Sequence, residues 1–230
     1  MKLETDFELA VDDAAIAGIL PAGVERPGLR HRLESAIEDL EAFVAPAACY
    51  EAHPIERILH ERVELAGGTR IGCGLLTSVI AGAEELYVAV CTLGAALDQR
   101  IRAHRDGGRY VEMLLLDELG SWAIDHVRTQ LYERVEAELA DRGYRPSSAL
   151  SPGDAAWPLR EQRIFFELLD PSQIGVTLET GDLMRPLKSL SLAFGAGTGE
   201  LGSEGVDRCH YCSIRDRCRY ALAASPAAPA

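Results

Sequence analysis

The chain has 230 residues, of which 36 are acidic and 23 are lysine or arginine, so its formal net charge is −13. Hydrophobic residues make up 47% of it, enough for a packed core, which argues against wholesale disorder. The negative charge argues against a general nucleic-acid binder and against adhesion to an anionic membrane surface. No apolar run approaches the roughly 20 residues that span a bilayer, and the amino terminus lacks a signal-peptide pattern, so we expect a cytoplasmic protein.

The amino-terminal part of the chain is predicted to contain short strands around one helix. Residues 7–11 alternate loosely between apolar and polar, as a short strand does. An apolar stripe over 29–44 predicts an amphipathic helix. Residues 47–65 alternate loosely with Pro54 in the middle, which predicts one or two edge strands.

The central part carries the strongest helix signals. The continuously apolar run 86–91 predicts a buried strand, and the turn Thr92-Leu93-Gly94 leads from it into a helix over 95–104. A long apolar stripe predicts a helix over 109–140, which Gly120 is expected to kink or divide.

The carboxyl-terminal part mixes loops, a short helix and strands. Residues 141–158 are rich in Pro, Gly and Ser and predict a long loop, and a short helix follows. Strands are predicted over 174–178 and 189–194, with a turn at 179–182 between them. The mixed order of elements predicts an α+β fold with a mixed sheet and long helices.

Composition divides the chain into four parts. Residues 1–195 form the expected folded domain, and 196–205 read as a flexible Gly-rich linker. Residues 206–220 contain three cysteines and form the expected metal-binding segment, and 221–230 predict a disordered low-complexity tail.

Two segments stand out as candidate binding elements. The loop from Arg145 to Leu159 holds three prolines and Gly153, which stiffen the backbone and let it approach a ligand closely, although composition alone favours a structured connector. The segment Pro186-Leu187-Lys188-Ser189 contains one of only two lysines in an arginine-rich chain. A lysine retained there suits a role that arginine does not fill, and the alternative is the polar face of a strand.

Several short motifs, taken in order, resemble one known family. They are Ser151-Pro152-Gly153, Trp157-Pro158-Leu159, Phe166-Glu167-Leu168-Leu169, Ile174-Gly175-Val176-Thr177-Leu178 and Pro186-x-Lys188-Ser189-x-Ser191. Together with Cys91-Thr92-Leu93-Gly94 upstream, they resemble the carboxyl-terminal activation domain of cobalamin-dependent methionine synthase. The resemblance covers most of residues 80–195 and is strongest over 151–194.

The resemblance implies a fold, a ligand and a partner. Members of that family bind S-adenosylmethionine on an α+β domain and present its methyl group to a cobalamin held by another domain or protein. The chain would then be a stand-alone activation subunit whose partner is a corrinoid-binding protein or methionine synthase subunit. An acidic electron carrier such as flavodoxin or ferredoxin is the expected electron donor.

The ligand loop departs from the family pattern Arg-x-x-Pro-Gly-Tyr at two positions. Alignment on Pro152-Gly153 places Ala149 where the family has arginine and Asp154 where it has tyrosine. Arg145 is a substitute for the missing cation, and Asp125 is the best match to the family's acidic residue on the long helix, although an ordinary exposed carboxylate is an equal alternative. The implied ligand-binding residues are Asp125, Arg145, Ser151, Pro152, Gly153, Asp154, Lys188 and Ser189.

The cysteine cluster near the carboxyl end predicts a metal site. Cys209, Cys212 and Cys218 lie within ten residues, a spacing that brings three thiolates to one metal centre. Three free cysteines on a mobile tail are the alternative. Zinc and an iron–sulfur cluster both fit. A cluster needs a fourth cysteine, Cys73 or Cys49, and the electron chemistry implied by the resemblance favours iron–sulfur.

Two functions therefore remain open from the sequence. The first is an activation subunit that binds S-adenosylmethionine and supports reductive remethylation of a partner's corrinoid, which Pro152-Gly153 and Lys188-Ser189 favour. The second is an iron–sulfur or zinc-bearing electron-transfer or docking module that has lost the ligand, which Ala149 and Asp154 favour.

Overall fold

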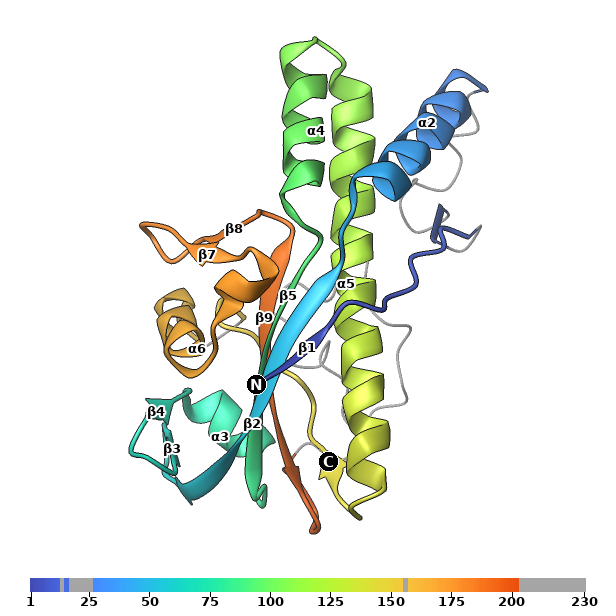
Figure 1. Ribbon diagram of the computed structural model, residues 1–230. Helices are drawn as coiled ribbons and strands as arrows, with labels where there is room; N and C mark the ends of the chain where they lie inside the picture. The colour runs from blue at the N-terminus through green and yellow to red at the C-terminus, as the bar shows by residue number, and fades with distance from the viewer. Residues whose placement is uncertain (13–14, 17–26, 155–156, 203–230) are drawn as a thin grey trace.

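The computed structural model describes residues 1–12, 15–16, 27–154 and 157–202. Its elements, in chain order, are β1 (Lys2–Glu4), α2 (Pro27–Phe43), β2 (Ala47–Ile58), β3 (Val63–Leu65), β4 (Arg70–Ile71), α3 (Gly74–Val79), β5 (Glu85–Thr92), α4 (Ala95–Asp106), α5 (Tyr110–Ala140), β6 (Arg145–Pro146), η1 (Leu159–Glu161), α6 (Gln162–Leu168), η2 (Pro171–Ile174), β7 (Thr177–Leu178), β8 (Met184–Arg185) and β9 (Ser189–Gly197). Figure 1 shows α5 running the length of the molecule beside the sheet.

The sheet is antiparallel and has seven strands. Their order is β4-β3-β2-β5-β9-β6, and β1 pairs with β2 outside this path. β5 pairs with β2 on one side and with β9 on the other, so it lies at the centre and is buried along nearly its whole length. The strands β7 and β8 form a separate two-stranded hairpin. The predicted α+β class with long helices is confirmed, and the sheet is antiparallel throughout its described pairings where a mixed sheet was predicted.

Two hydrophobic clusters cover the two faces of the sheet. One face packs against α2, α4 and α5 and includes Cys91, Leu192 and Phe194. The other face packs against α3, α6 and the β7–β8 hairpin and includes Val90 and Ala193. Figure 1 shows α5 on one side of β9 and α6 with the hairpin on the other. β9 therefore lies between the long helix and the segments that carry several of the family-like motifs, Phe166-Glu167-Leu168-Leu169 and Ile174-Gly175-Val176-Thr177-Leu178.

The strand predicted at residues 7–11 is wrong. Phe7, Leu9 and Val11 pack against the helix-side cluster, but the backbone there has no strand partner among the described residues. The Gln130 side chain accepts a hydrogen bond from the Glu8 N–H and donates one to the Glu8 carbonyl, so α5 satisfies this backbone. The amino-terminal strand forms earlier, as β1.

The edge position predicted for residues 47–65 is also wrong. β2 runs through Pro54 and lies inside the sheet, pairing with β5 from Ala47 to Pro54. Pro54 is tolerated because it forms the last pair with β5, at the place where β2 changes its other partner from β1 to β3.

The strand predicted over 174–178 begins three residues late. Pro171 starts the short helix η2, which ends at Gly175 in the left-handed conformation (φ 72°), and only Thr177–Leu178 form a strand.

The boundary predicted after residue 195 falls inside β9. Gly195 has no room for a side chain, because a Cβ there would lie 2.6 Å from Ala83, and Ala196 is fully buried. Leu201 is buried, and the Gly202 N–H donates to the Ala81 carbonyl. The first part of the expected linker is therefore packed against α3 and the sheet. The cysteine segment 206–220 and the tail 221–230 lie outside the described residues.

Candidate functional site

The turn after β5 is joined to the start of β9 by a set of hydrogen bonds. The Leu93 N–H donates to the Lys188 carbonyl at 3.0 Å, and the Ser189 hydroxyl donates to Thr92 Oγ1 at 2.8 Å. Thr92 Oγ1 also accepts from the Gly94 N–H, and Gly94 has a positive φ of 83° that glycine adopts readily. The structure thus brings together two motifs that lie almost a hundred residues apart.

A buried carboxylate strengthens this junction. Asp98, in the first turn of α4, is only 5% exposed, and its Oδ2 accepts a hydrogen bond from the Leu187 N–H at 2.7 Å. Its Oδ1 is buried without a partner among the described residues. Asp98 therefore fixes the backbone immediately before Lys188.

The Lys188 side chain reaches α5 instead of the solvent. Its ammonium group lies 2.8 Å from Asp117 Oδ1 and donates to the Ser121 hydroxyl at 2.9 Å. Gly120 makes room for this approach, because a Cβ there would lie 3.1 Å from both Lys188 Cε and Leu97 Cδ2. α5 continues through Gly120 as one helix, so the expected division is wrong and the glycine serves close packing.

A stripe of polar residues on α5 follows the edge of β9. Residues at spacings of three or four share one face of a helix, and this stripe consists of Asp117, Ser121, Asp125, Arg128 and Tyr132. At one end Asp117 and Ser121 hold Lys188; at the other, the Tyr132 hydroxyl donates to the Ser147 carbonyl and its ring stacks edge-on against Phe194.

The two anchored ends place Asp125 beside the middle of β9. From Asp117 to Tyr132 the helix rises about 22 Å, and from Lys188 to Phe194 an extended strand covers about 20 Å. Between these two contacts, α5 and β9 therefore run in the same direction over nearly equal lengths. Asp125 lies about 12 Å along the helix from Asp117, which corresponds to the level of Ser191.

Asp125 carries a partner on the same stripe. Arg128 Nη2 lies 2.8 Å from Asp125 Oδ1, one turn further along the helix. The Arg128 side chain is 13% exposed and that of Asp125 is 33% exposed, so the pair is partly withdrawn from solvent. An ion pair in this setting is stronger than one on the open surface.

The predicted ligand loop meets β9 from the other side. Leu150 forms an isolated bridge with Ala193, and the chain then leaves the strand at Ser151 and Pro152. Gly153 has a positive φ of 101° and its N–H donates to the Trp157 carbonyl at 2.8 Å. The loop thus turns away near the level of Ser191.

Asp154 acts within the loop. Its Oδ2 accepts a hydrogen bond from the Ser151 N–H at 2.9 Å, and its own N–H donates to the Ser151 carbonyl. Burial raises the pKa of this carboxyl above its usual value. Asp154 therefore closes a tight turn and braces Pro152-Gly153, a role different from that of an aromatic ring facing a ligand.

Between the helix stripe and the loop, one edge of β9 lacks a strand partner among the described residues over 189–191, and we call this segment the open edge. Ser189 and Leu190 are half-buried there, and Ser191 is only 2% exposed. β9 pairs with β5 along one side from Ser189 to Ala196. On its other side, within the described ranges, it meets only β6 at Ala196–Gly197 and the bridge at Ala193. The strand edge over 189–191 has no described strand partner there. Lys188 immediately precedes it, and Asp125 and the Ser151–Asp154 turn lie at its level along β9.

Arg145 lies elsewhere. It is exposed on β6 and pairs in register with Gly197, about 20 Å along β9 from Ser191. Ala149 packs against the helix-side cluster. The structure thus brings Asp125, Lys188, Ser189 and the Ser151–Asp154 turn to one edge, and it places Arg145 at the far end of the strand.

The described cysteines are buried in the core. Cys49 and Cys91 are fully buried and Cys73 is 9% exposed, so all three belong to the hydrophobic core. Burial raises the pKa of the Cys49 thiol to about 11, which disfavours the thiolate that a metal needs. Cys209, Cys212 and Cys218 lie outside the described residues, and no group of three potential ligands forms a metal site within the described ones.

Sequence reasoning missed the residues that support this edge. Asp98, Asp117, Ser121 and Arg128 each contact or adjoin a predicted residue, but none belongs to a motif. The i, i+4, i+8 spacing of Asp117, Ser121 and Asp125 was the available signal, because it predicts one polar stripe on a helix that is otherwise apolar toward the core.

The comparisons with known proteins agree with this fold. No protein-family model and no curated protein matches the chain. Among solved structures, it is similar to the crystal structure of the MetH reactivation domain bound to AdoHcy, with a TM-score of 0.59 and 17% identity. The match covers 76% of this chain and 66% of that one. The chain thus has the fold of that domain: antiparallel sheet, long helix and carboxyl-terminal strand. No described helix has the length and apolar character that crossing a membrane requires.

Proposed function

We propose that the open edge of β9 binds S-adenosylmethionine and its product AdoHcy, and that the chain is an activation subunit for a corrinoid methyltransferase such as methionine synthase. The observation that carries the proposal is the unpaired strand edge at 189–191, flanked by the α5 stripe and the Ser151–Asp154 turn. It occurs in a fold shared with a reactivation domain that binds AdoHcy.

The residues at this edge suit such a ligand. Unpaired strand N–H and C=O groups offer donors and acceptors to a nucleoside or an amino-acid end. Asp125 offers a carboxylate to the ligand's ammonium group, and the rigid turn at Pro152-Gly153 lets the ligand approach the backbone. Lys188 and Ser189 act by holding the strand to α5 and to the β5 turn.

The chemistry belongs to the ligand and to the partner's corrinoid. S-adenosylmethionine supplies an activated methyl group, and the protein supplies binding and orientation. The partner is a corrinoid-binding protein or a methionine synthase subunit, and we place the reaction in the cytoplasm.

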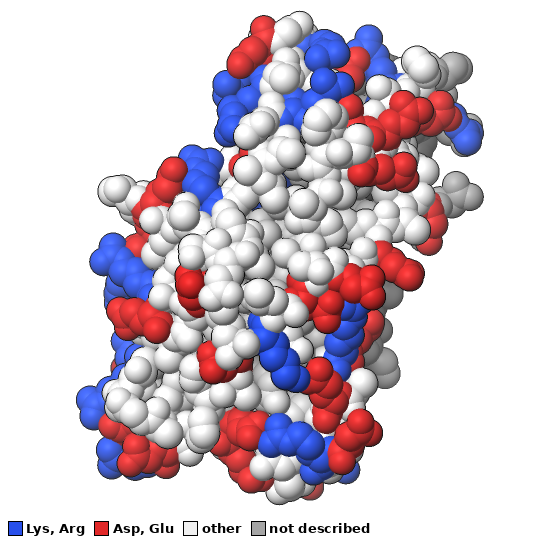
Figure 2. Space-filling model, in the orientation of Figure 1, with Lys and Arg blue, Asp and Glu red and all other residues white. Residues whose placement is uncertain are grey.

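The reductive step needs an electron donor. Lys and Arg side chains gather over α4, where Arg102 and Arg105 are exposed on a chain with a net charge of −13 (Figure 2). This patch is complementary to an acidic electron carrier such as flavodoxin or ferredoxin. Cys209, Cys212 and Cys218 would add an iron–sulfur cluster or a zinc site.

A second function is favoured by the loop itself. Asp154 is turned inward and Ala149 has no charge, so the loop presents neither the ring nor the cation that the family pattern contains. These two positions support a metal-bearing electron-transfer or docking module without a small ligand.

Calorimetric titration with AdoHcy separates the two functions. The activation subunit should bind AdoHcy, and Asp125→Ala should weaken binding by roughly 1–3 kcal/mol, because a charged ligand group loses its partner. Thr129→Ala, on the exposed side of the same helix, is the matched control and should bind normally. The absence of any binding by the unmutated protein would favour the docking module.

A further inference from the structure

The Asp125–Arg128 pair places two opposite charges side by side on the α5 stripe, at the level of Ser191 to Ala193 of β9. The two atoms in contact are 2.8 Å apart, and the guanidinium side chain is the more buried of the two, at 13% exposure. A guanidinium has five N–H donors in a planar fork, and one contact with Asp125 leaves it the geometry to bind a second carboxylate.

The amino-acid end of S-adenosylmethionine and AdoHcy is the complementary shape. It carries a carboxylate and an ammonium group on one carbon atom, so it needs a cation and an anion next to each other. We propose that Arg128 binds the carboxylate of this amino-acid end while Asp125 binds its ammonium group. This inference rests on the proposed function and assigns a specificity-determining residue to the same site.

The position of Arg128 on α5 supports the assignment. It lies on the stripe between Asp125 and Tyr132, whose two ends are held to β9 and to Ser147. Its place along the helix is therefore near Leu192 and Ala193 of β9, next to the segment 189–191. A rigid helix held at both ends keeps the charged pair in place before a ligand arrives, which reduces the ordering cost of binding.

Arg145 is the rival cation. Its register with Gly197 puts it about 20 Å along the strand from the level of Asp125. That distance exceeds the span between a carboxylate and an ammonium on one carbon, so Arg145 and Asp125 do not serve the same amino-acid end. Ala149, at the loop position where the family has arginine, packs against the hydrophobic cluster on the α5 side of the sheet and provides no cation for the ligand's carboxylate.

The experiment compares two ligands on four proteins by calorimetry. The ligands are AdoHcy and 5′-methylthioadenosine, which keeps the adenosine but lacks the amino-acid end. The proteins are the unmutated chain, Arg128→Gln, Arg128→Lys and the control Arg145→Gln. Circular dichroism and thermal melting confirm that each variant is folded.

Arg128→Gln should weaken AdoHcy binding roughly ten- to hundredfold and leave 5′-methylthioadenosine binding within about twofold. Arg128→Lys should be intermediate, because the charge remains and the fork is lost. Arg145→Gln should bind both ligands normally.

Three results would overturn the inference, and they are distinguishable. If the unmutated protein binds AdoHcy and Arg128→Gln binds it equally well, Arg128 has no such role while the proposed function stands. Loss of AdoHcy binding in Arg145→Gln alone would transfer the role to that residue. If the folded unmutated protein binds neither ligand, the proposed function fails and this inference fails with it.

Discussion

The ammonium group of Lys188 lies 2.8 Å from a carboxylate oxygen of Asp117, and its aliphatic stem crosses α5 at Gly120. This contact joins the start of β9 to the long helix. Together with the Asp98–Leu187 hydrogen bond, it fixes one end of the open strand edge. The site is therefore built from packing and ion pairing between elements distant in sequence.

The first prediction concerns Gly120. A methyl group there would lie 3.1 Å from Leu97 and Lys188, so Gly120→Ala should destabilise the fold by roughly 1–3 kcal/mol through overpacking. This loss should exceed the gain of up to about 1 kcal/mol that alanine gives a helix. Urea denaturation measures the difference.

Gly28→Ala is the matched control for that measurement. Gly28 also lies in a helix, and a Cβ there would have no atom within 4 Å. It should leave stability unchanged or raise it slightly. Equal stabilisation by both substitutions would show that Lys188 does not approach α5 closely.

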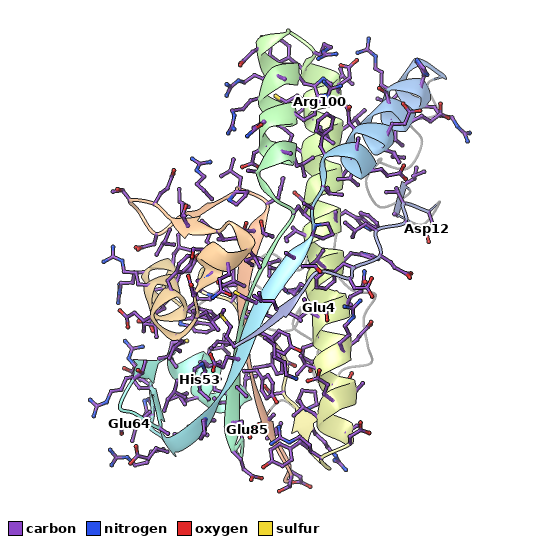
Figure 3. All side chains as sticks on the ribbon, in the orientation of Figure 1. Glu4, Asp12, His53, Glu64, Glu85 and Arg100 are labelled. Atoms are coloured by element: carbon purple, nitrogen blue, oxygen red, sulfur yellow. The ribbon has the colours of Figure 1, made fainter. Side chains whose placement is uncertain are left out.

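The second prediction concerns pH. Asp39 on α2 accepts hydrogen bonds from Arg100 at 2.9 Å and pairs with the buried His104 at 2.7 Å (Figure 3 labels Arg100, where α4 meets α2). Burial alone would raise the pKa of the Asp39 carboxyl, but Arg100 and His104 outweigh it and hold the pKa below the ordinary 3.8. Because the folded-state pKa is lowered, this stabilisation is complete above 3.8 and is lost as the pH falls through the lowered value.

Asp39→Asn should therefore lower the melting temperature at pH 7, and the gap to the unmutated protein should narrow below pH 3.8. Thermal melts recorded across this range provide the test. Asp106→Asn, which removes an exposed pair with Arg105, should have little effect at any pH. A gap that stays constant down to acid pH would contradict the role given to Asp39.

The third prediction concerns the cysteine segment. Protein purified without oxygen should contain iron and acid-labile sulfide, and Cys212→Ser should abolish the visible absorption. The folded domain should survive this change, because the described core is built from residues up to Gly202. Stoichiometric zinc without sulfide would replace the iron–sulfur assignment by a structural zinc site.

Sustained patterns of apolar residues in the sequence predicted the long buried elements correctly. The long helix over 109–140 and the strand over 86–91 appear as α5 and β5 because their apolar periodicity is sustained. The segment 7–11 misled because its alternating side chains are buried by α5, while its backbone is satisfied by Gln130. Alternation of apolar and polar residues indicates which side chains are buried. Whether the segment forms a strand depends on a neighbouring strand, which the local sequence does not contain.

The sequence motifs predicted several residues of the candidate site, but not the side chains that hold those residues in place. Lys188 and Asp125 were named from the sequence, but Lys188 turns toward Asp117 and Ser121, and Asp125 pairs with Arg128. These partners depend on how α5 lies against β9, which is set by packing across the sheet. Arg145 was named by its nearness to the loop in sequence, and the strand register carries it to the far end of β9.

The central claim is that a ligand occupies the β9 edge at 189–191, and NMR with ¹⁵N-labelled protein tests it most directly. Addition of AdoHcy should shift the backbone amides of Ser189, Ser191, Ser151 and Gly153 and the helix amides around Asp125, and it should leave those of β3 and β4 unchanged. Saturable shifts confined to another surface, or no shifts at millimolar AdoHcy, would contradict the account.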